Sequence, residues 1–281
     1  ILKDIFREEW ILEHHSSYED SMPDDGDARD YSAIQQRKKL ACENWDYPII
    51  VTTSVQFFES LFSNKPYRCR KLHNIAESVV IFDEVQTLPK EVTLPTLQML
   101  EDVQKVMKTS FLFCTATQPS FHKRPRFDGI STIIPLVDDP GQLYERTRRV
   151  DYQLLNALNP IDYGELLQKV AGTEDSVLVI FNTKKAALEF YNHARNEPEW
   201  ERIYHLSTAM CPSHRKDVIK RIVDARKVER KILVISTQLV EAGVDFDFPA
   251  VFREIAPLEA VIQAAGRCNR EGRLTTHGNV F

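Results

Sequence analysis

The sequence predicts an α/β protein made of two doubly wound domains, each built on a parallel sheet. Short, continuously apolar segments alternate with segments of helical periodicity, as is typical of parallel sheets covered by helices on both faces. A polar segment at 135–141, with two prolines and a glycine, interrupts this alternation, which then starts again. A chain of 281 residues can form two domains, because one domain typically takes roughly 100–200 residues.

The first series of elements follows an acidic, polar segment at 16–31, whose composition predicts an exposed loop. A helix is expected at 33–45, with Ser32 as its N-cap. The elements expected after it are a strand at 49–53, a helix at 55–62, a strand at 79–82, a helix at 94–108 and a strand at 110–114.

The second series starts beyond the polar segment, next to a basic segment at 146–149. The expected domains are therefore residues 1–145 and 146–281. The elements expected in the second domain are a strand at 176–181, a helix at 184–196, a strand at 202–206, a helix at 213–223, strands at 231–236 and 250–253, and a helix that begins with 258–263.

Composition excludes several classes of protein. The chain is 43% hydrophobic and 27% charged. It contains no run of about 18 apolar residues, so the sequence predicts no membrane span. Its five cysteines are widely spaced and form no CxxC pair, which argues against a zinc site or a disulfide framework. Reduced thiols of this kind indicate a cytoplasmic location.

Charge does not decide whether the chain binds nucleic acid. The segment 19–30 holds six acidic residues and one arginine, so it accounts for the formal net charge of −5. A protein that grips phosphates through backbone amides and a few side chains needs no high net charge. Solvated surface is as good an interpretation of each basic cluster as ligand binding. These clusters lie at Lys65–Lys71, His122–Arg126, Arg146–Arg149 and Arg267–Arg273.

Two adjacent carboxylates, Asp83 and Glu84, end the apolar strand at 79–82. In open α/β sheets, ligands bind beyond the carboxyl ends of the strands. Asp83 is predicted to hold magnesium against nucleotide phosphates, and Glu84 to orient and polarise an attacking water. An ordinary strand end is the alternative for this motif alone.

Hydroxyl groups follow the next strand, in the tripeptide Thr115, Ala116 and Thr117. Hydroxyls at a strand end can bond a carboxylate of the neighbouring strand, and could thereby sense a nucleotide γ-phosphate. A simple Ser/Thr turn is the alternative here.

Two further motifs lie in the second domain. After the strand that ends near Ser236, Gly243 permits a positive φ or a close backbone approach, and Asp245 is free to accept a ribose or backbone donor. Arg267 and Arg270 stand three residues apart, as on one helix face, where they could clamp phosphoryl oxygens. The alternatives are a loop for the first motif and a basic helix end for the second.

With these motifs in this order, the chain resembles the superfamily-two helicases. More narrowly, it resembles the helicase–nuclease of type I CRISPR interference, the "Cas-three" family. The resemblance rests on segments spread over nearly the whole chain: Glu13–Ser16, Val51–Phe62, Arg70–Asn74, Phe82–Pro89, Thr115–Pro119, Ser236–Asp245 and Gln263–Arg270.

This resemblance implies two RecA-like domains that use ATP and magnesium, with Asp83 and Glu84 as the Walker B pair. Gln86 is then expected to contact the nucleotide and to couple hydrolysis to the opposite domain, and Thr115 and Thr117 to link hydrolysis to movement. Expected single-stranded DNA contacts include Thr52, Thr53, Gln56, Thr115, Thr117, Thr237 and Gln238. Expected nucleotide contacts in the second domain are Gly243, Asp245 and Gln263, and Arg267 and Arg270 are expected to be catalytic there, as arginine fingers. The family's partners are single-stranded DNA and a crRNA-guided surveillance complex, and a phage anti-CRISPR inhibitor is a further candidate.

The chain also departs from the family pattern. None of its nine glycines is followed by lysine, so it contains no GxxxxGK[ST] phosphate loop. It contains no His-Asp dipeptide either, which excludes the family's nuclease motif, and the accessory C-terminal domain is also expected to be absent. The chain is therefore expected to be the later part of one RecA-like domain and most of a second, and to be inactive alone. His14 and His15 are expected to form local hydrogen bonds rather than to bind a metal.

Two alternatives stay open for the function. The same motor could belong to an RNA helicase or a restriction-type translocase. The isolated chain could instead be an inert docking module.

Overall fold

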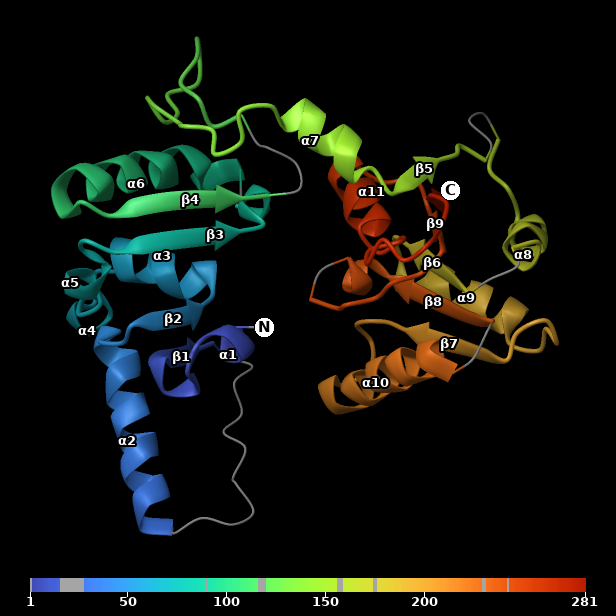
Figure 1. Cartoon of the computed structure of the whole chain (residues 1–281), viewed down its shortest axis with the longest axis horizontal. Coiled ribbons are helices and arrows are strands. Elements are labelled where there is room, and N and C mark those ends of the chain that lie inside the picture. The colour runs from blue at the N-terminus through green and yellow to red at the C-terminus, as the bar shows by residue number, and fades with distance from the viewer. Residues whose placement is uncertain are drawn as a thin grey trace. The chain divides into compact units, whose positions relative to one another are not determined.

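The computed structural model describes residues 2–15, 28–88, 90–115, 120–155, 159–173, 176–228, 231–241 and 243–281. It divides into two compact units, residues 1–134 and 135–281 (Figure 1). The division falls at the start of the predicted break at 135–141. Residues 135–145, which were predicted to belong to the first domain, therefore lie in the second unit. No helix among the described residues is long and apolar enough to cross a membrane.

Parallel strand pairs form the sheets of the first unit. β1 (Ile11–His14) pairs with β2 (Ile49–Thr52), and β3 (Val79–Asp83) pairs with β4 (Ser110–Cys114). In the second pair Asp83 lies opposite Cys114, so both strands end at the same edge. The predicted strands are thus confirmed, while β1 was not predicted.

Helices accompany these strands. The prediction of Ser32 as an N-cap is wrong, because α2 begins at Ala28 and Ser32 lies inside it. No glycine or proline stands between Ala28 and Ser32, so nothing there stops the helix from extending. The helical segments of the first unit are α1 (Leu2–Ile5), η1 (Glu8–Trp10), α2 (Ala28–Asn44), α3 (Ser54–Phe62), α4 (Pro66–Cys69), α5 (Leu72–Ile75), η2 (Val85–Thr87), η3 (Lys90–Val92) and α6 (Thr93–Met107).

An aromatic cluster holds β3 in place. Phe82 stacks on Phe58 of α3 and on Phe113 of β4, with ring centroids 5.5 and 5.8 Å apart. Phe57 meets the Phe82 ring edge-on at 5.3 Å. Aromatic pairs of this kind add to the free energy of area burial. Because Phe82 immediately precedes Asp83, this packing fixes the end of the strand that carries the two carboxylates.

The second unit contains one six-stranded sheet, in the order β5-β10-β9-β6-β8-β7. Its strands pair in parallel, as predicted. Phe181 lies opposite Thr237 and Ile180 opposite Arg253, so three neighbouring strands end at one edge. The strands are β5 (Val150–Tyr152), β6 (Val177–Phe181), β7 (Arg202–Leu206), β8 (Ile232–Thr237), β9 (Ala250–Arg253) and β10 (Gly278–Val280).

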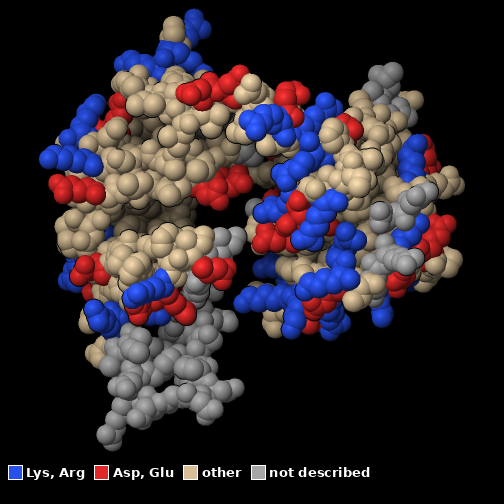
Figure 2. Space-filling view, viewed as in Figure 1, with Lys and Arg blue, Asp and Glu red and all other residues tan. Residues whose placement is uncertain are grey.

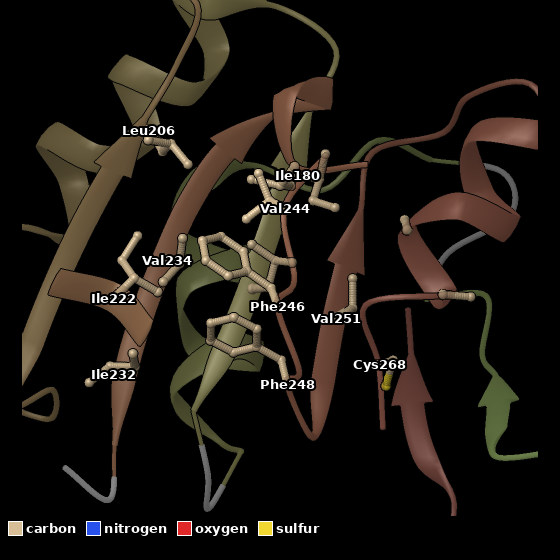
Figure 3. Close-up of a cluster of buried hydrophobic side chains, with 14 of the residues drawn as sticks. Ile180, Leu206, Ile222, Ile232, Val234, Val244, Phe246, Phe248, Val251 and Cys268 are labelled. Atoms are coloured by element: carbon tan, nitrogen blue, oxygen red, sulfur yellow. The ribbon is translucent and has the colours of Figure 1, made fainter. Parts of the chain in front are cut away.

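Both faces of this sheet are covered. Leu178 and Ile180 of β6 pack into a cluster with residues of α10, α11 and the chain before β9 (Figure 3). The alternate residues Val177, Val179 and Phe181 pack into a second cluster with α8 and α9. Because successive side chains of a strand point to opposite faces, this division shows a doubly wound sheet. The helical segments are α7 (Pro140–Thr147), α8 (Tyr163–Ala171), α9 (Lys184–Ala194), α10 (Pro212–Val228), η4 (Gln238–Val240) and α11 (Leu258–Ala265).

Candidate functional site

The carboxylates of the first unit stand where β3 gives way to the turn η2. Asp83 is exposed, and its Oδ1 accepts a hydrogen bond from the backbone N–H of Glu84 at 3.1 Å. Glu84 has a φ of 54°, in the left-handed region, so the extended chain cannot continue through it. The sharp turn therefore separates the two adjacent acids and starts η2.

Gln86 links Glu84 to the neighbouring strand. Its Nε2 donates to Oε2 of Glu84, and its Oε1 accepts from the hydroxyl of Thr115. The strand-end hydroxyl was predicted to bond a carboxylate of the neighbouring strand, and here it reaches one through an amide. Thr115, Gln86 and Glu84 thus form a hydrogen-bonded chain across the carboxyl ends of β3 and β4. Thr117, predicted in the same role, lies outside the described residues.

The three residues predicted to bind DNA near β2 also have local structural partners. Thr52 donates to the carbonyl oxygen of His14 at 2.9 Å. Thr53 is the N-cap of α3, and its hydroxyl accepts from the Gln56 N–H at 3.3 Å. The Gln56 side-chain oxygen accepts from Nζ of Lys71 at 3.4 Å. Of the three predicted contacts, Thr53 is exposed, and Thr52 and Gln56 are half-buried.

Lys71 and Trp45 lie in the same region, but the sequence did not predict them as site residues. Lys71 is 6% exposed, and its ammonium lies 4.7 Å from the centroid of the Trp45 ring. Burial lowers the pKa of Lys71 below its ordinary value. The Trp45 N–H in turn donates to Nδ1 of His14 at 2.9 Å, so His14 has a local hydrogen bond. The sequence marked Lys71 only as part of a basic cluster, because nothing in the local pattern indicates its burial.

In the second unit, β8 leads into the turn η4. Thr237 is 5% exposed, and its hydroxyl has no hydrogen-bond partner among the described residues. Gln238, the next residue, is exposed. Gly243 has a φ of 71°, the kind of conformation that its sequence position suggested.

Arg267 and Arg270 differ in their surroundings. The prediction that they share a helix face is wrong, because α11 ends at Ala265 with Gly266 as its C-cap. Arg267 is 7% exposed and donates to the carbonyl oxygens of Val240 at 2.7 Å and Glu241 at 2.5 Å.

Arg270 is exposed and pairs with Asp245 at 3.0 Å. This contact joins two of the residues predicted to face the nucleotide. Gln263 lies half-buried near the end of α11. Of the two arginines, Arg270 is therefore the one whose guanidinium is open to a ligand.

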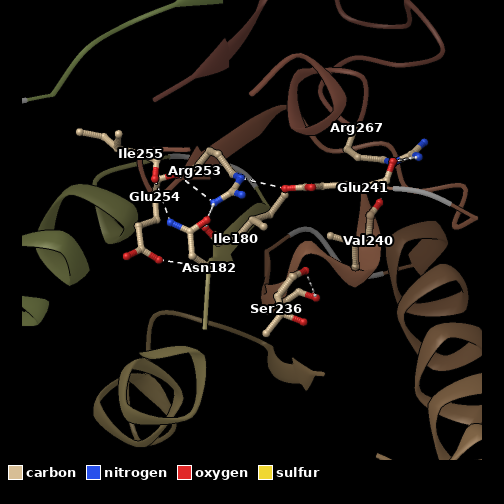
Figure 4. A network of polar contacts seen from close by, with 10 residues as sticks. Ile180, Asn182, Ser236, Val240, Glu241, Arg253, Glu254, Ile255 and Arg267 are labelled. Atoms are coloured by element: carbon tan, nitrogen blue, oxygen red, sulfur yellow. Dashed lines mark hydrogen bonds and ion pairs between the residues drawn. The ribbon is translucent and has the colours of Figure 1, made fainter. Parts of the chain in front are cut away.

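A buried ion pair that the sequence did not predict joins the end of β9 to the segment after η4 (Figure 4). Nε of Arg253 is 2.8 Å from Oε1 of Glu241, and the two side chains are 1% and 7% exposed. Arg253 also donates to the side-chain oxygen of Asn182 at 2.8 Å and to the Glu254 carbonyl at 2.9 Å. Burial raises the pKa of Glu241, although Arg253 and Arg267 oppose that rise.

This network joins the ends of three chain segments. Asn182 follows β6, Arg253 ends β9 and Glu241 follows η4. A charged residue at the end of an apolar strand was the signal that identified Asp83, and Arg253 carries the same signal after Ala250–Phe252. The sequence could therefore have indicated a role for Arg253, but it gave no sign that Arg253 pairs with Glu241.

The donor set suits a metal that is shared with a nucleotide. No group of three or more His, Cys, Asp or Glu residues that could hold a metal ion occurs among the residues described. Magnesium usually keeps several waters and binds one or two carboxylates together with substrate phosphates. The exposed carboxylate of Asp83 at a strand end fits that arrangement.

Comparison with known proteins identifies relatives of the chain. Residues 173–273 match the family model described as "CRISPR-associated nuclease/helicase Cas3, C-terminal". The CRISPR-associated nuclease/helicase Cas3 of Methanothermobacter thermautotrophicus is 28% identical over an alignment of 201 residues, which covers 68% of this chain and 24% of the relative. The Haloferax volcanii protein of the same name is 25% identical over 317 residues, covering 81% of this chain and 34% of the relative. The chain thus spans about a quarter to a third of the length of these relatives.

Solved structures confirm the fold class. T. fusca Cas3 with AMPPNP superposes with a TM-score of 0.64 at 16% identity, covering 83% of this chain and 32% of that one. A chain of a structure titled "CRISPR RNA-guided surveillance complex, pre-nicking" gives a TM-score of 0.61 at 16% identity, covering 89% of this chain and 37% of that one. The predicted pair of RecA-like α/β domains is therefore confirmed.

Proposed function

This chain is part of the helicase core of the Cas3 nuclease/helicase family, and from that premise we propose that it serves an ATP-driven motor that moves along single-stranded DNA. The hydrogen-bonded chain from Thr115 through Gln86 to Glu84 carries this proposal. Through these hydrogen bonds Glu84, the proposed general base at the end of β3, is connected to the segment that follows β4. Hydrolysis at Glu84 can thereby alter the position of the segment after β4.

In the first unit, Asp83 would hold the magnesium ion and Glu84 would orient the attacking water. Magnesium, when bound with ATP, neutralises the charge that develops on the transferring phosphoryl group. Gln86 fixes the carboxylate of Glu84 through its amide N–H. A carboxylate held in one orientation is a better general base, because its geometry is set before the reaction begins.

In the second unit, we assign Arg270 to the phosphoryl oxygens, since its guanidinium is exposed and held by Asp245. The sequence predicts Arg267 for the same task. In this fold Arg267 would act by fixing the carbonyl groups of Val240 and Glu241. Gly243, Asp245 and Gln263 complete the nucleotide contacts that we propose.

The DNA contacts would be Thr52, Thr53, Gln56, Thr115, Thr117, Thr237 and Gln238. Thr237 is buried, so its contact with DNA would need a local rearrangement. We further propose a crRNA-guided surveillance complex as the partner, because a structural neighbour of this fold comes from such a complex. A phage inhibitor of CRISPR defence is a further proposed partner, and the cytoplasm the proposed location.

The test is ATP hydrolysis by a complete Cas3 protein that carries these residues, with single-stranded DNA or RNA of the same sequence added. Stimulation by the DNA is expected. Stimulation by RNA alone would contradict the DNA assignment and favour the RNA helicase alternative. Failure of both nucleic acids to stimulate would contradict the motor itself.

A further inference from the structure

A basic hairpin follows β4 in the first unit, in a segment to which none of the functions above assigns a role. His122, Lys123, Arg124 and Arg126 are exposed there, with Asp128 as the one acid. In Figure 1 this segment lies in the green loop above α6, and lysine and arginine side chains gather there in Figure 2. The hairpin is thus a positively charged projection on a chain whose formal net charge is −5.

Backbone hydrogen bonds hold the hairpin in one shape. Arg124 and Phe127 exchange N–H···O bonds, both of 2.9 Å, across a two-residue turn. At its base, the Ile130 N–H donates to the Phe121 carbonyl at 2.8 Å, and both side chains are buried in the core at 7% exposure. The basic side chains therefore project from a support that is ordered before any ligand arrives, which lowers the entropy cost of binding.

Arg126 occupies the turn position that normally belongs to glycine. Pro125 precedes it and its own φ is 70°, as at the third position of a type II turn. A residue with a Cβ is strained in that region, so glycine would suit the fold better. The turn therefore presents the Arg126 side chain from a position at which glycine would be less strained.

The remaining groups of the hairpin hold each other in place. Nζ of Lys123 pairs with Asp128 at 2.6 Å, which raises the pKa of Lys123 and lowers that of Asp128. The Arg124 guanidinium lies 4.8 Å from the centroid of the Phe127 ring and donates to the Ser120 hydroxyl at 2.5 Å. Arg126 forms no ion pair with another residue that the structure describes.

We propose that this hairpin, residues 122–128, binds the phosphate backbone of double-stranded DNA, with Arg126 as its principal contact. Cations on a fixed turn suit phosphates, which carry no sequence information and need no base contact. Single-stranded DNA is usually held by exposed aromatic rings on which bases stack. Phe127, the ring in this hairpin, is half-buried and covered by Arg124, so the hairpin offers charge without a stacking surface. A duplex also has the higher charge density of the two.

The proposal does not depend on ATP hydrolysis, so it can be tested on this chain without nucleotide. The measurement is fluorescence anisotropy of a labelled 20-base-pair duplex and of the matching single strand, between 20 and 200 mM KCl. For Arg126→Gly, we expect about tenfold weaker duplex binding at 50 mM KCl. The slope of log K against log salt should shrink by about 0.9, the value for one lost duplex phosphate contact. Asp128→Asn should strengthen duplex binding, because it releases Lys123.

Two controls separate binding from folding and from total charge. Lys39→Gln removes one exposed positive charge from α2 of the same unit and should leave duplex binding almost unchanged. Arg126→Gly should keep or raise the Tm, because it relieves the positive φ, so weaker binding could not be attributed to unfolding. Equal effects of the Arg126 and Lys39 changes would overturn the proposal. So would a loss of single-strand binding as large as the loss of duplex binding, or no duplex binding by the unaltered chain at 20 mM KCl.

Discussion

Glu84 combines a left-handed backbone conformation with a side chain that is held by a hydrogen bond. Its φ of 54° ends β3, and its carboxylate accepts a hydrogen bond from Gln86. The backbone strain and the fixed side chain occur at one position, as is common where catalytic geometry is imposed by the surrounding structure. The substitution of Glu84 should therefore affect chemistry more than folding.

In a complete Cas3 protein that carries these residues, Glu84→Gln should preserve nucleotide binding and abolish translocation. Loss of a general base typically lowers kcat by about 10²–10⁴-fold. The measurements are ATP affinity by equilibrium binding and strand displacement on a tailed duplex. Glu91→Gln, which removes an exposed carboxylate from the same unit, is the matched control. Normal unwinding by Glu84→Gln would show that the base has been misassigned.

Glu241 should make the stability of the second unit depend on pH. Burial raises its pKa in the folded state, so the folded chain holds this proton at a pH where the unfolded chain has lost it. Its contribution to the free energy of unfolding is thus present below the ordinary pKa of 4.5 and is lost as pH rises through the raised value.

The stability difference between the unaltered chain and Glu241→Gln should accordingly fall as pH increases above 4.5. Urea unfolding at several pH values measures it. Trp200 is the single tryptophan of residues 135–281, so its fluorescence reports on this unit once Trp10 and Trp45 are replaced by phenylalanine. Glu259→Gln, an exposed carboxylate on α11, should show no such trend. A difference that is constant with pH would contradict the raised pKa.

At the scale of elements, the Arg253 network fastens β6, β9 and the segment after η4 to one another. These segments are far apart in sequence, since Arg253 and Asn182 are separated by 71 positions. The guanidinium is 1% exposed, so its charge is balanced by Glu241 rather than by water. Removing either partner would leave the other charge buried and uncompensated.

Arg253→Met should lower the free energy of unfolding of the second unit by about 3–5 kcal/mol. The double change Arg253→Met with Glu241→Leu should recover most of this loss, because no unpaired charge then remains buried. Urea unfolding followed by Trp200 fluorescence measures both. Arg273→Met, in an exposed ion pair with Glu271, should cost less than about 1 kcal/mol. An equal cost for the Arg253 and Arg273 changes would mean that the buried pair is not important for stability.

At the scale of the whole molecule, the two α/β units carry different sets of motifs. The first holds the carboxylates and the hydroxyl of Thr115, and the second holds the arginines. The sequence contains no GxxxxGK[ST] segment, which is the loop through which P-loop NTPases bind the nucleotide phosphates.

We therefore expect the 281-residue chain by itself to show no magnesium-dependent ATP hydrolysis, with or without single-stranded DNA. A coupled phosphate-release assay measures this, with the Glu84→Gln chain as the background control. Turnover clearly above that control would contradict the expectation. It would mean that other residues of the chain replace the phosphate loop.

The sequence by itself determined the central strands, the two-part organisation and the location of the carboxylates, while the short strands β1, β5 and β10 were not predicted. Continuous apolar segments such as Val177–Phe181 leave little choice but a buried parallel strand, and a charged pair after such a segment must stand at its end. These inferences succeed because each depends on neighbours within a few positions of the chain.

Only the tertiary structure decided which side chains meet. Gln86 lies between Glu84 and Thr115, which is 29 positions further along, and Arg267 reaches a carbonyl 27 positions away. The tertiary structure also decided that Arg253 is buried with Glu241 and that α11 ends before Arg267. Hydrogen-bond partners far apart in sequence depend on how strands and turns pack, and one sequence read alone contains no record of that packing.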